Sequence, residues 1–412
     1  MLASAKFFKS PKSNVVGAKH FESMPVIKLV RSSFYHELET KRALAEFVLN
    51  SEIFSMSTQC REFEQAFAAK QGRKHAVYVA NGSVANLLLI QSMMSLGHFR
   101  PGDKIGFSAL TWPTNVMPLI QLGMHPVPID CELETLNVSP RALRASIDGL
   151  RGLFLTNVLG FCDDLSAVKS LCDDANIILI EDNCESLGSR YHGQLLGNFG
   201  LAASFSFFVG HHLSTIEGGM VVTDDDELHQ SLVIGRAHGW DRNLTLEQQQ
   251  ELRGAHDVDD FYARYTFYEL ASNFRPTEIN GFIGNTQLKY WDEIVERRAT
   301  NYAFLAERLS ANPDFYALDV SHMDLVSNFA VPVISKTAEL GDAYRRKFAD
   351  AAVEIRPIIA GNMTRQPFYR KYVEFTPPLP NSDTIHSNGF YFGNHAELTE
   401  ADLDLLANLI VR

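Results

Sequence analysis

The sequence contains few cysteines, and they lie far apart. Only five of the 412 residues are cysteine, and no pair has the CxxC or CxC spacing that is typical of metal or cluster ligation. An odd number of scattered thiols also gives no basis for a disulfide framework. We therefore expect reduced thiols and no bound metal.

Long apolar runs and basic clusters are also missing. The longest apolar runs, such as residues 177–180, are far shorter than the roughly 20 residues that a transmembrane helix needs. The formal net charge is -12 and no stretch is rich in lysine or arginine, which argues against general affinity for nucleic acid. Lysines interrupt the apolar residues near the N-terminus, so no secretion signal is expected there. These absences predict a cytoplasmic protein with no membrane or nucleic-acid partner, and a poorly ordered leader over residues 1–24.

From about residue 58 the chain alternates between helix-like and strand-like segments. This alternation is typical of an α/β protein with a mostly parallel sheet. Seven strand candidates indicate one large sheet, and they lie at residues 75–83, 104–110, 125–130, 152–159, 177–182, 203–208 and 219–223. We predict an α/β fold built on one large, mixed, mostly parallel sheet.

The C-terminal part has a different pattern. Apolar residues recur at three-, four- and seven-residue spacings over residues 288–309, which predicts one long amphipathic helix between two domains. Thr399 can cap a final helix. We place a large domain over residues 25–289 and a smaller α+β domain over residues 290–412, and we interpret the polar stretch 244–260 as a surface excursion.

Three polar motifs lie at the C-terminal ends of predicted strands, where open α/β sheets bind ligands. Gly82 and Ser83 lie in a turn that enters a helix, and the free amides of such a turn suit a phosphate, although an ordinary turn would look the same. Asp182 ends an apolar strand, with Glu185 three residues on. A buried carboxylate needs a donor. A protonated pyridine nitrogen would serve, as would a salt bridge or a helix cap.

The third motif, residues 204–223, contains no lysine. Ser206 can offer a hydroxyl to the same phosphate, and the glycines before the last strand allow a tight turn. His211 and His212 are adjacent and would point in opposite directions from an extended chain, so they are poor joint ligands for one metal. An imidazole can act as acid and base near neutral pH.

Together these motifs resemble the sugar-nucleotide aminotransferase family, which are pyridoxal-phosphate enzymes of fold type I. The resemblance covers residues 30–412 and is clearest in "HHLSTIEGG", "RAHGWDRNL" and "SNFRPTEINGFIGNTQL". Family members have a lysine at the position of His211, and the histidine resembles the 3-dehydratase branch that makes 3,6-dideoxysugars such as colitose. The resemblance implies removal of the C3 hydroxyl from a nucleotide-linked 4-keto-6-deoxyhexose, GDP-linked 4-keto-6-deoxy-D-mannose being favoured. It also implies that L-glutamate converts pyridoxal 5'-phosphate to pyridoxamine 5'-phosphate.

The resemblance also implies residue roles within a homodimer that shares its active sites. His211 would be the catalytic acid and base. The residues expected to bind the cofactor are Gly82, Ser83, Trp112, Asp182, Glu185, Ser206 and, from the partner subunit, Asn273. Candidates for binding the sugar nucleotide are His212, Arg242 and Arg356, although His212 could equally pack beneath the strand and both arginines could form surface salt bridges. Taken alone, Trp112 suggests a core residue and Asn273 a helix cap or turn.

Three alternatives stay open at this point. A related dehydratase type acts on CDP-linked sugars with an iron–sulfur cluster, but the region after Trp240 has none of the clustered cysteines that a cluster needs. An ordinary sugar aminotransferase would need another lysine, for example Lys289. A non-catalytic regulator that binds the cofactor or a sugar would explain the missing lysine, but the chain has no appended DNA-binding module. Val84 occupies a position where a small or hydroxyl-bearing residue is common in the family. We expect this departure to affect the contacts with the phosphate.

Overall fold

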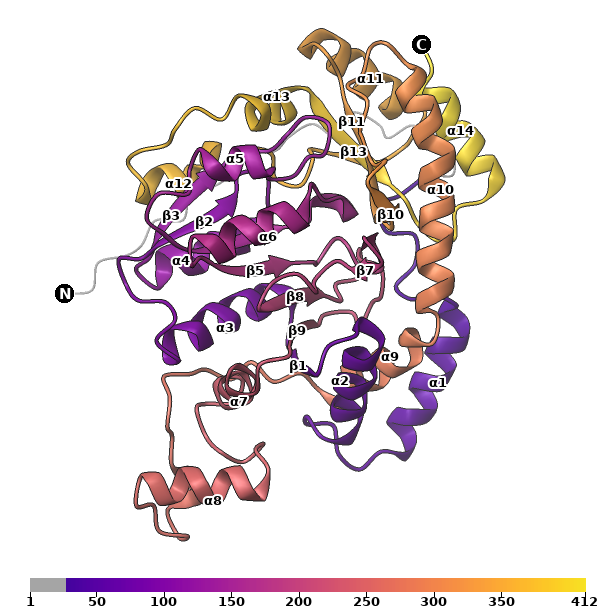
Figure 1. Ribbon diagram of the computed structural model, residues 1–412. Coiled ribbons are helices and arrows are strands. Elements are labelled where there is room, and N and C mark those ends of the chain that lie inside the picture. Colours follow the sequence, from indigo (N-terminus) through magenta and orange to yellow (C-terminus); the bar gives the residue numbers. More distant parts are fainter. Residues whose placement is uncertain (1–26) are drawn as a thin grey trace, which may run out of the picture.

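The computed structural model describes residues 27–412, so the predicted leader at residues 1–24 lies outside the described part. A seven-stranded sheet forms the centre of the molecule (Figure 1). All seven predicted strands are confirmed. They are β1 (His75–Val79), β2 (Lys104–Ser108), β3 (His125–Ile129), β4 (Leu150–Thr156), β5 (Ile178–Asp182), β8 (Ala202–Ser206) and β9 (Gly219–Thr223).

The strand order is β1-β9-β8-β5-β4-β2-β3. In this sheet β9 is antiparallel to both of its neighbours, and the other strands run parallel to one another. The predicted mixed, mostly parallel sheet is therefore confirmed. Because the parallel strands share one direction, the carboxyl ends of β1, β4, β5 and β8 meet at the same edge, where an α/β sheet binds its ligands.

Helices cover both faces of the sheet, as a mostly parallel sheet requires. Successive residues of β1 separate the two layers: Val77 and Val79 face one core, and Ala76 and Tyr78 face the other. The helices of the first layer are α3 (Gly82–Ser95), α4 (Met117–Gln121) and α7 (Asp226–Gly235). The second layer contains α2 (Thr58–Gln71), α5 (Pro140–Arg144) and α6 (Leu165–Asp174).

The C-terminal part contains a three-stranded antiparallel sheet in the order β11-β13-β12. Its strands are β11 (Ala330–Ile334), β12 (Ile355–Arg356) and β13 (Gly389–Gly393), and its helices include α10 (Trp291–Ala311), α11 (Ala338–Asp350) and α14 (Glu400–Ile410). The long predicted helix is confirmed but begins at Trp291, because residues 289–290 form a turn after α9 (Glu278–Leu288). Thr399 caps α14 in a capping box, also as predicted.

The predicted boundary near residue 290 falls between α9 and α10. Side chains from both sides of it share one hydrophobic core, in which Val158 and Phe161 pack with Val331 and Phe392. The division into two domains stays a prediction, because this shared core joins the two parts.

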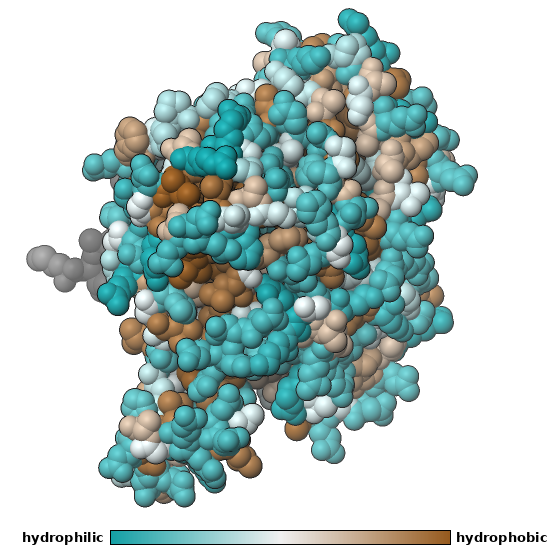
Figure 2. Space-filling view, viewed as in Figure 1, coloured by the Kyte–Doolittle hydropathy of each residue, from teal (hydrophilic) through white to brown (hydrophobic). Residues whose placement is uncertain are grey.

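The polar stretch near residue 250 forms α8 (Leu246–Ala255), which has no buried residue. Figures 1 and 2 show that it projects from the body of the molecule, which confirms the predicted surface excursion. The remaining α-helices are α1 (Glu37–Asn50), α12 (Pro367–Tyr372) and α13 (Pro380–Asn388). A small third sheet has the order β10-β6-β7 and consists of β6 (Arg190–Tyr191), β7 (Gln194–Leu195) and β10 (Met323–Leu325). Within residues 27–412, no helix combines the length and the apolar character needed to cross a membrane.

Candidate active site

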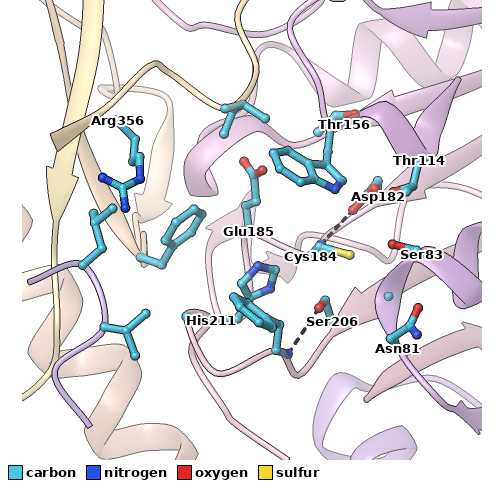
Figure 3. Close-up of a pocket in the computed structure, with 18 of the residues that line it drawn as sticks. Asn81, Ser83, Thr114, Thr156, Asp182, Cys184, Glu185, Ser206, His211 and Arg356 are labelled. Carbon is cyan, nitrogen blue, oxygen red and sulfur yellow. Dashed lines mark hydrogen bonds between the residues drawn. The ribbon is translucent and has the colours of Figure 1, made fainter. Parts of the chain in front are cut away.

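A cavity of about 900 Å³ lies at the carboxyl edge of the large sheet. Its wall combines residues that follow β1, β4, β5 and β8 with residues of the C-terminal part (Figure 3). The structure brings most of the predicted site residues together in this wall: Gly82, Ser83, Trp112, Asp182, Glu185, Ser206, His211 and Arg356. These residues are up to 274 positions apart in the chain, from Gly82 to Arg356 (356 − 82 = 274).

The N-terminus of α3 forms one end of the cavity. The side chain of Asn81 caps the helix by accepting a hydrogen bond from the Val84 amide at 2.9 Å. The first amides of a helix have no partner inside it, so those of Gly82 and Ser83 are available to an anion. A Cβ on Gly82 would lie 2.6 Å from the Cβ of Ser206, so only glycine allows this approach. The valine at position 84 packs against the core and leaves the available amides in place.

Asp182 lies at the end of β5 and is almost fully buried. One carboxylate oxygen accepts a hydrogen bond from the Cys184 amide, and the other accepts one from the Asn86 side chain, each at 2.9 Å. The carboxylate is thus held from two sides where it faces the cavity. The sequence analysis missed Asn86, although a polar residue on the buried side of α3, one turn after Gly82, was a usable signal.

Glu185 is a buried acid in the same wall. The pKa of its carboxyl is raised to about 8, chiefly by burial; a hydrogen bond from the Leu159 amide at 2.9 Å opposes the shift, and the nearby Asp182 adds to it. Leu159 donates this bond from a left-handed backbone conformation with φ of 51°. Glu185 is therefore largely protonated, and able to donate a hydrogen bond, at neutral pH.

His211 projects into the cavity between Arg356 on one side and Asp182 on the other (Figure 3). Its ring stacks on Phe329 at 5.4 Å, with an angle of 21° between the two planes. Its Nδ1 is buried and has no hydrogen-bond partner among residues 27–412. Burial lowers the pKa of this imidazole to about 4, and the carboxylate of Asp182 opposes that shift. At neutral pH the imidazole is therefore an uncharged base.

The loop after His211 turns for a different reason from the one expected. The residue with a left-handed backbone is Ile216, with φ of 72°, and Gly218 and Gly219 do not have positive φ values. These glycines are needed for close packing instead: a Cβ on Gly218 would lie 2.2 Å from the Thr215 hydroxyl, and one on Gly219 would lie 2.3 Å from the Asn81 carbonyl oxygen.

Four residues named in the sequence analysis lie outside the cavity of their own chain. His212 is buried behind it, with Nε2 3.2 Å from the carbonyl oxygen of Ser327, which matches the packing alternative. The guanidinium of Arg242 lies 4.0 Å from the ring of Trp240 and donates to a backbone carbonyl. Asn273 is exposed beside the start of α9, and Lys289 pairs with Glu39 at 3.5 Å on the surface.

The C-terminal wall contains the predicted Arg356 and adds Glu354, Phe329 and Tyr391, which were not predicted. Arg356 forms an ion pair with Glu354, whose other oxygen accepts a hydrogen bond from the Leu29 amide at 3.0 Å. Tyr391 and Phe329 also face the cavity. Glu354, Phe329 and Tyr391 do not follow a strand of the large sheet or belong to a recognisable motif, so the sequence offered no signal for them.

The chain is similar to known proteins over most of its length. The GDP-4-keto-6-deoxy-D-mannose 3-dehydratase of Escherichia coli O55:H7 is 31% identical over 387 residues, which cover 92% of this chain and 98% of that protein. The Yersinia pseudotuberculosis protein of the same name is 32% identical over 84% of this chain and 89% of its own. The lipopolysaccharide biosynthesis protein RfbH of Salmonella typhimurium is 31% identical over 84% of each chain.

Solved structures agree with these relatives. A crystal structure of GDP-4-keto-6-deoxymannose-3-dehydratase with a trapped PLP-glutamate geminal diamine has a TM-score of 0.85 and 29% identity, covering 93% of this chain and 99% of that chain. A mutant of the same enzyme with bound GDP-perosamine has a TM-score of 0.86 and 30% identity over 93% and 100% of the two chains. The family model of the DegT/DnrJ/EryC1/StrS aminotransferases matches residues 36–411. The chain therefore belongs to the DegT/DnrJ/EryC1/StrS aminotransferase family.

Proposed function

We propose that this protein is a pyridoxal-phosphate-dependent 3-dehydratase, with a lyase-type reaction on GDP-4-keto-6-deoxy-D-mannose. L-Glutamate converts the cofactor to its pyridoxamine form, and the C3 hydroxyl of the sugar is then removed. One observation carries the proposal: a histidine, His211, lies opposite Asp182 in a cavity where no described lysine is part of the wall, in a chain over 30% identical to two such enzymes. The missing lysine disfavours the aminotransferase alternative.

The cavity fits the proposed cofactor. The doubly held carboxylate of Asp182 suits a protonated pyridine nitrogen, and the free amides of α3 with the Ser206 hydroxyl suit a phosphate. The indole of Trp112 is half exposed and faces the cavity, so it can cover an aromatic ring. Glu185, protonated at neutral pH, can donate a hydrogen bond to a ring substituent.

His211 supplies the proton transfers. When bound, the cofactor provides an electron-withdrawing ring that makes a neighbouring C–H bond acidic. The uncharged imidazole of His211 can take that proton at a ring nitrogen and deliver it to the departing C3 hydroxyl. Because an imidazole does not bond covalently to the cofactor as a lysine amine does, its nitrogens stay free for both transfers.

The sugar nucleotide would enter past Arg356. A planar guanidinium suits the oxygens of a diphosphate. In the structure this guanidinium pairs with Glu354, so substrate binding would exchange one anionic partner for another. His212, buried behind the cavity, would support the loop of His211 and not contact the sugar.

A homodimer with shared sites is part of the same proposal. Asn273 and Arg242 lie away from the cavity of their own chain, so a role in catalysis requires a second subunit. The segment between α8 and α9 also exposes a group of large apolar side chains, which marks an interaction surface. These are Phe261, Tyr262, Tyr265, Phe267 and Leu270. The product would serve 3,6-dideoxysugar synthesis, colitose being the candidate sugar, and the reaction is placed in the cytoplasm.

A direct assay tests the proposal. The purified protein would be incubated with pyridoxal 5'-phosphate, L-glutamate and either GDP- or CDP-linked 4-keto-6-deoxyhexose, and both 2-oxoglutarate and C3 deoxygenation would be followed by mass spectrometry. We expect deoxygenation of the GDP-linked sugar, and a loss of about 10²- to 10⁴-fold in His211→Asn, the range typical of general acid–base groups. Absence of deoxygenation with every sugar, or full activity in H211N, would overturn the proposal.

A further inference from the structure

Arg298 is a buried cation without an anionic partner. It lies on α10, its side chain is about 2% exposed, and no carboxylate of residues 27–412 forms an ion pair with it. Burial lowers the pKa of its guanidinium to about 9, so the group is still charged at neutral pH. A buried charge is costly unless hydrogen bonds compensate for it. The hydrogen-bond partners of the Arg298 guanidinium should therefore indicate the role of this charge.

The guanidinium connects three segments that are far apart in the sequence. One terminal nitrogen donates to the carbonyl oxygens of Asn394 and, at 3.4 Å, of Asn328. The other donates to the carbonyl oxygen of His211 at 3.4 Å. Asn394 donates in return to the Arg298 carbonyl oxygen at 2.9 Å. One side chain of α10 thus joins the loop of His211 to the residues that precede β11 and follow β13, at one end of the C-terminal sheet.

The same contacts also place the aromatic ring that covers His211. Asn328 directly precedes Phe329, whose ring stacks on the imidazole. The amide of Asn394 donates to the Phe329 carbonyl oxygen at 2.9 Å. Arg298 therefore binds the backbone on both sides of the stacked pair, at His211 itself and at the residue before Phe329.

Two fixed charges act on the pKa of the imidazole in opposite directions. Asp182, at the end of β5, favours its protonated form, and Arg298, from α10, disfavours it. Glu185 and His212 are uncharged at neutral pH, because burial raises the pKa of Glu185 and lowers that of His212, and Arg356 in the cavity wall is paired with Glu354. His395, in the same buried pocket, is likewise neutral. Arg298 is thus the cation that balances Asp182.

We propose that Arg298 is a positioning residue for the reaction of His211: it fixes the imidazole and its stacking ring, and it places a permanent positive charge behind them. This inference rests on the proposed function. Arg298 itself does not line the cavity, so it would act on the reaction through His211.

The test compares three variants in the full-length protein. Arg298→Met removes the charge and the donors, Arg298→Lys keeps the charge, and Arg308→Met changes another arginine of α10, whose guanidinium bonds only within that helix. The titration of His211 would be followed by NMR with 13C-labelled histidine, its signal being identified by its loss in H211N. The pH profile of kcat/KM would be recorded for each variant.

We expect the pKa of His211 to rise by about one pH unit in R298M, the size of effect that one nearby charge produces, with an equal shift of the acid limb of kcat/KM. R298K and R308M should stay near the wild type in both readouts. If R298M does not fold, Arg298→Gln replaces it, and a raised His211 pKa in R298K would itself overturn the proposal.

A uniform loss of kcat at every pH with an unchanged His211 pKa would show a merely structural role, and would overturn the proposal. The NMR titration needs no substrate. A failure of the proposed function would therefore leave the titration result intact, and the two failures can be told apart.

Discussion

At the level of single residues, the cavity holds two titratable groups whose pKa values move in opposite directions. Burial disfavours the charged form of each, which lowers the pKa of His211 to about 4 and raises that of Glu185 to about 8. At neutral pH the histidine is a free base and the carboxyl is a neutral donor. Pairs of groups separated in this way are characteristic of sites that carry out acid–base chemistry.

Glu185 should leave a signature in the pH dependence of stability. Its pKa is raised from 4.5 to about 8 in the folded protein, so unfolding releases a proton between these values and the free energy of unfolding falls as the pH rises. The buried histidines, whose pKa values are lowered in the folded protein, contribute a slope of the opposite sign up to about pH 7.5, so the contribution of Glu185 is obtained as the difference from a variant without its carboxyl. Relative to Glu185→Gln, we expect the free energy of unfolding of the wild type to fall by up to about 1.4 kcal/mol per pH unit between pH 5.5 and 7, the most that one proton contributes.

Urea unfolding of Glu185→Gln would check this expectation. The difference in the free energy of unfolding between wild type and this variant should change with pH by that amount between pH 5.5 and 7, whereas Glu217→Gln, which removes another carboxyl of the same cavity wall, should follow the wild type. An equal slope in wild type and E185Q would mean that Glu185 is ionised in the folded protein.

The sequence predicted only those site residues whose signal is local. Asp182 and His211 could be found because each follows a predicted strand and breaks a pattern, a carboxylate after an apolar run and a histidine where a lysine is usual. Phe329 and Arg298 could not, since their contacts with His211 join residues 87 or more positions apart. An arginine on an amphipathic helix has no sequence feature that separates it from a solvated one.

At the level of elements, the contact between α3 and β8 should determine cofactor binding. A methyl group on Gly82 would lie 2.6 Å from the Ser206 Cβ and 2.9 Å from its hydroxyl, so the start of α3 must shift in Gly82→Ala. We expect a loss of about 1–3 kcal/mol in stability, as in other overpacked sites, and weaker binding of pyridoxal 5'-phosphate. Thermal unfolding and a fluorescence titration with the cofactor would measure the two effects.

Gly254→Ala is the matched control for this prediction. Gly254 lies in α8, and a Cβ there would meet nothing within 4 Å. Its replacement should leave cofactor binding unchanged and stabilise α8 slightly, because alanine favours a helix over glycine. Wild-type affinity in G82A would show that the phosphate site does not depend on the approach of α3 to β8.

The large sheet could be predicted because each of its strands is an apolar run bounded by turn residues. Helix boundaries were harder to predict from the sequence. Helix α10 begins at Trp291 because residues 289–290 form a turn, which the spacing of the apolar residues does not reveal. Short strands such as β6, β7 and β12 have two residues each, too few to show an alternating pattern. They are defined by pairing with distant segments, which sequence periodicity does not contain.

At the level of the whole molecule, the segment between α8 and α9 contains Asn273, which the family resemblance assigns to the active site. Asn273 and the exposed aromatic residues near it do not line the cavity of their own chain. The proposed homodimer would account for both facts, since a symmetric dimer brings the same surface of each subunit against the other. The sequence could suggest this arrangement only through resemblance.

A subunit-mixing experiment tests the shared site. His211→Asn and Asn273→Ala should each reduce dehydratase activity as homodimers, if Asn273 acts in the partner's cavity. A heterodimer of the two, purified through two affinity tags, contains one site with both native residues, so we expect activity near half that of the wild-type dimer, one site of two. A heterodimer of H211N with Asp182→Ala is the control. Both residues belong to the same chain, so each of its sites carries a defect and it should stay inactive. Recovery in the control, or none with N273A, would contradict a site built from two subunits.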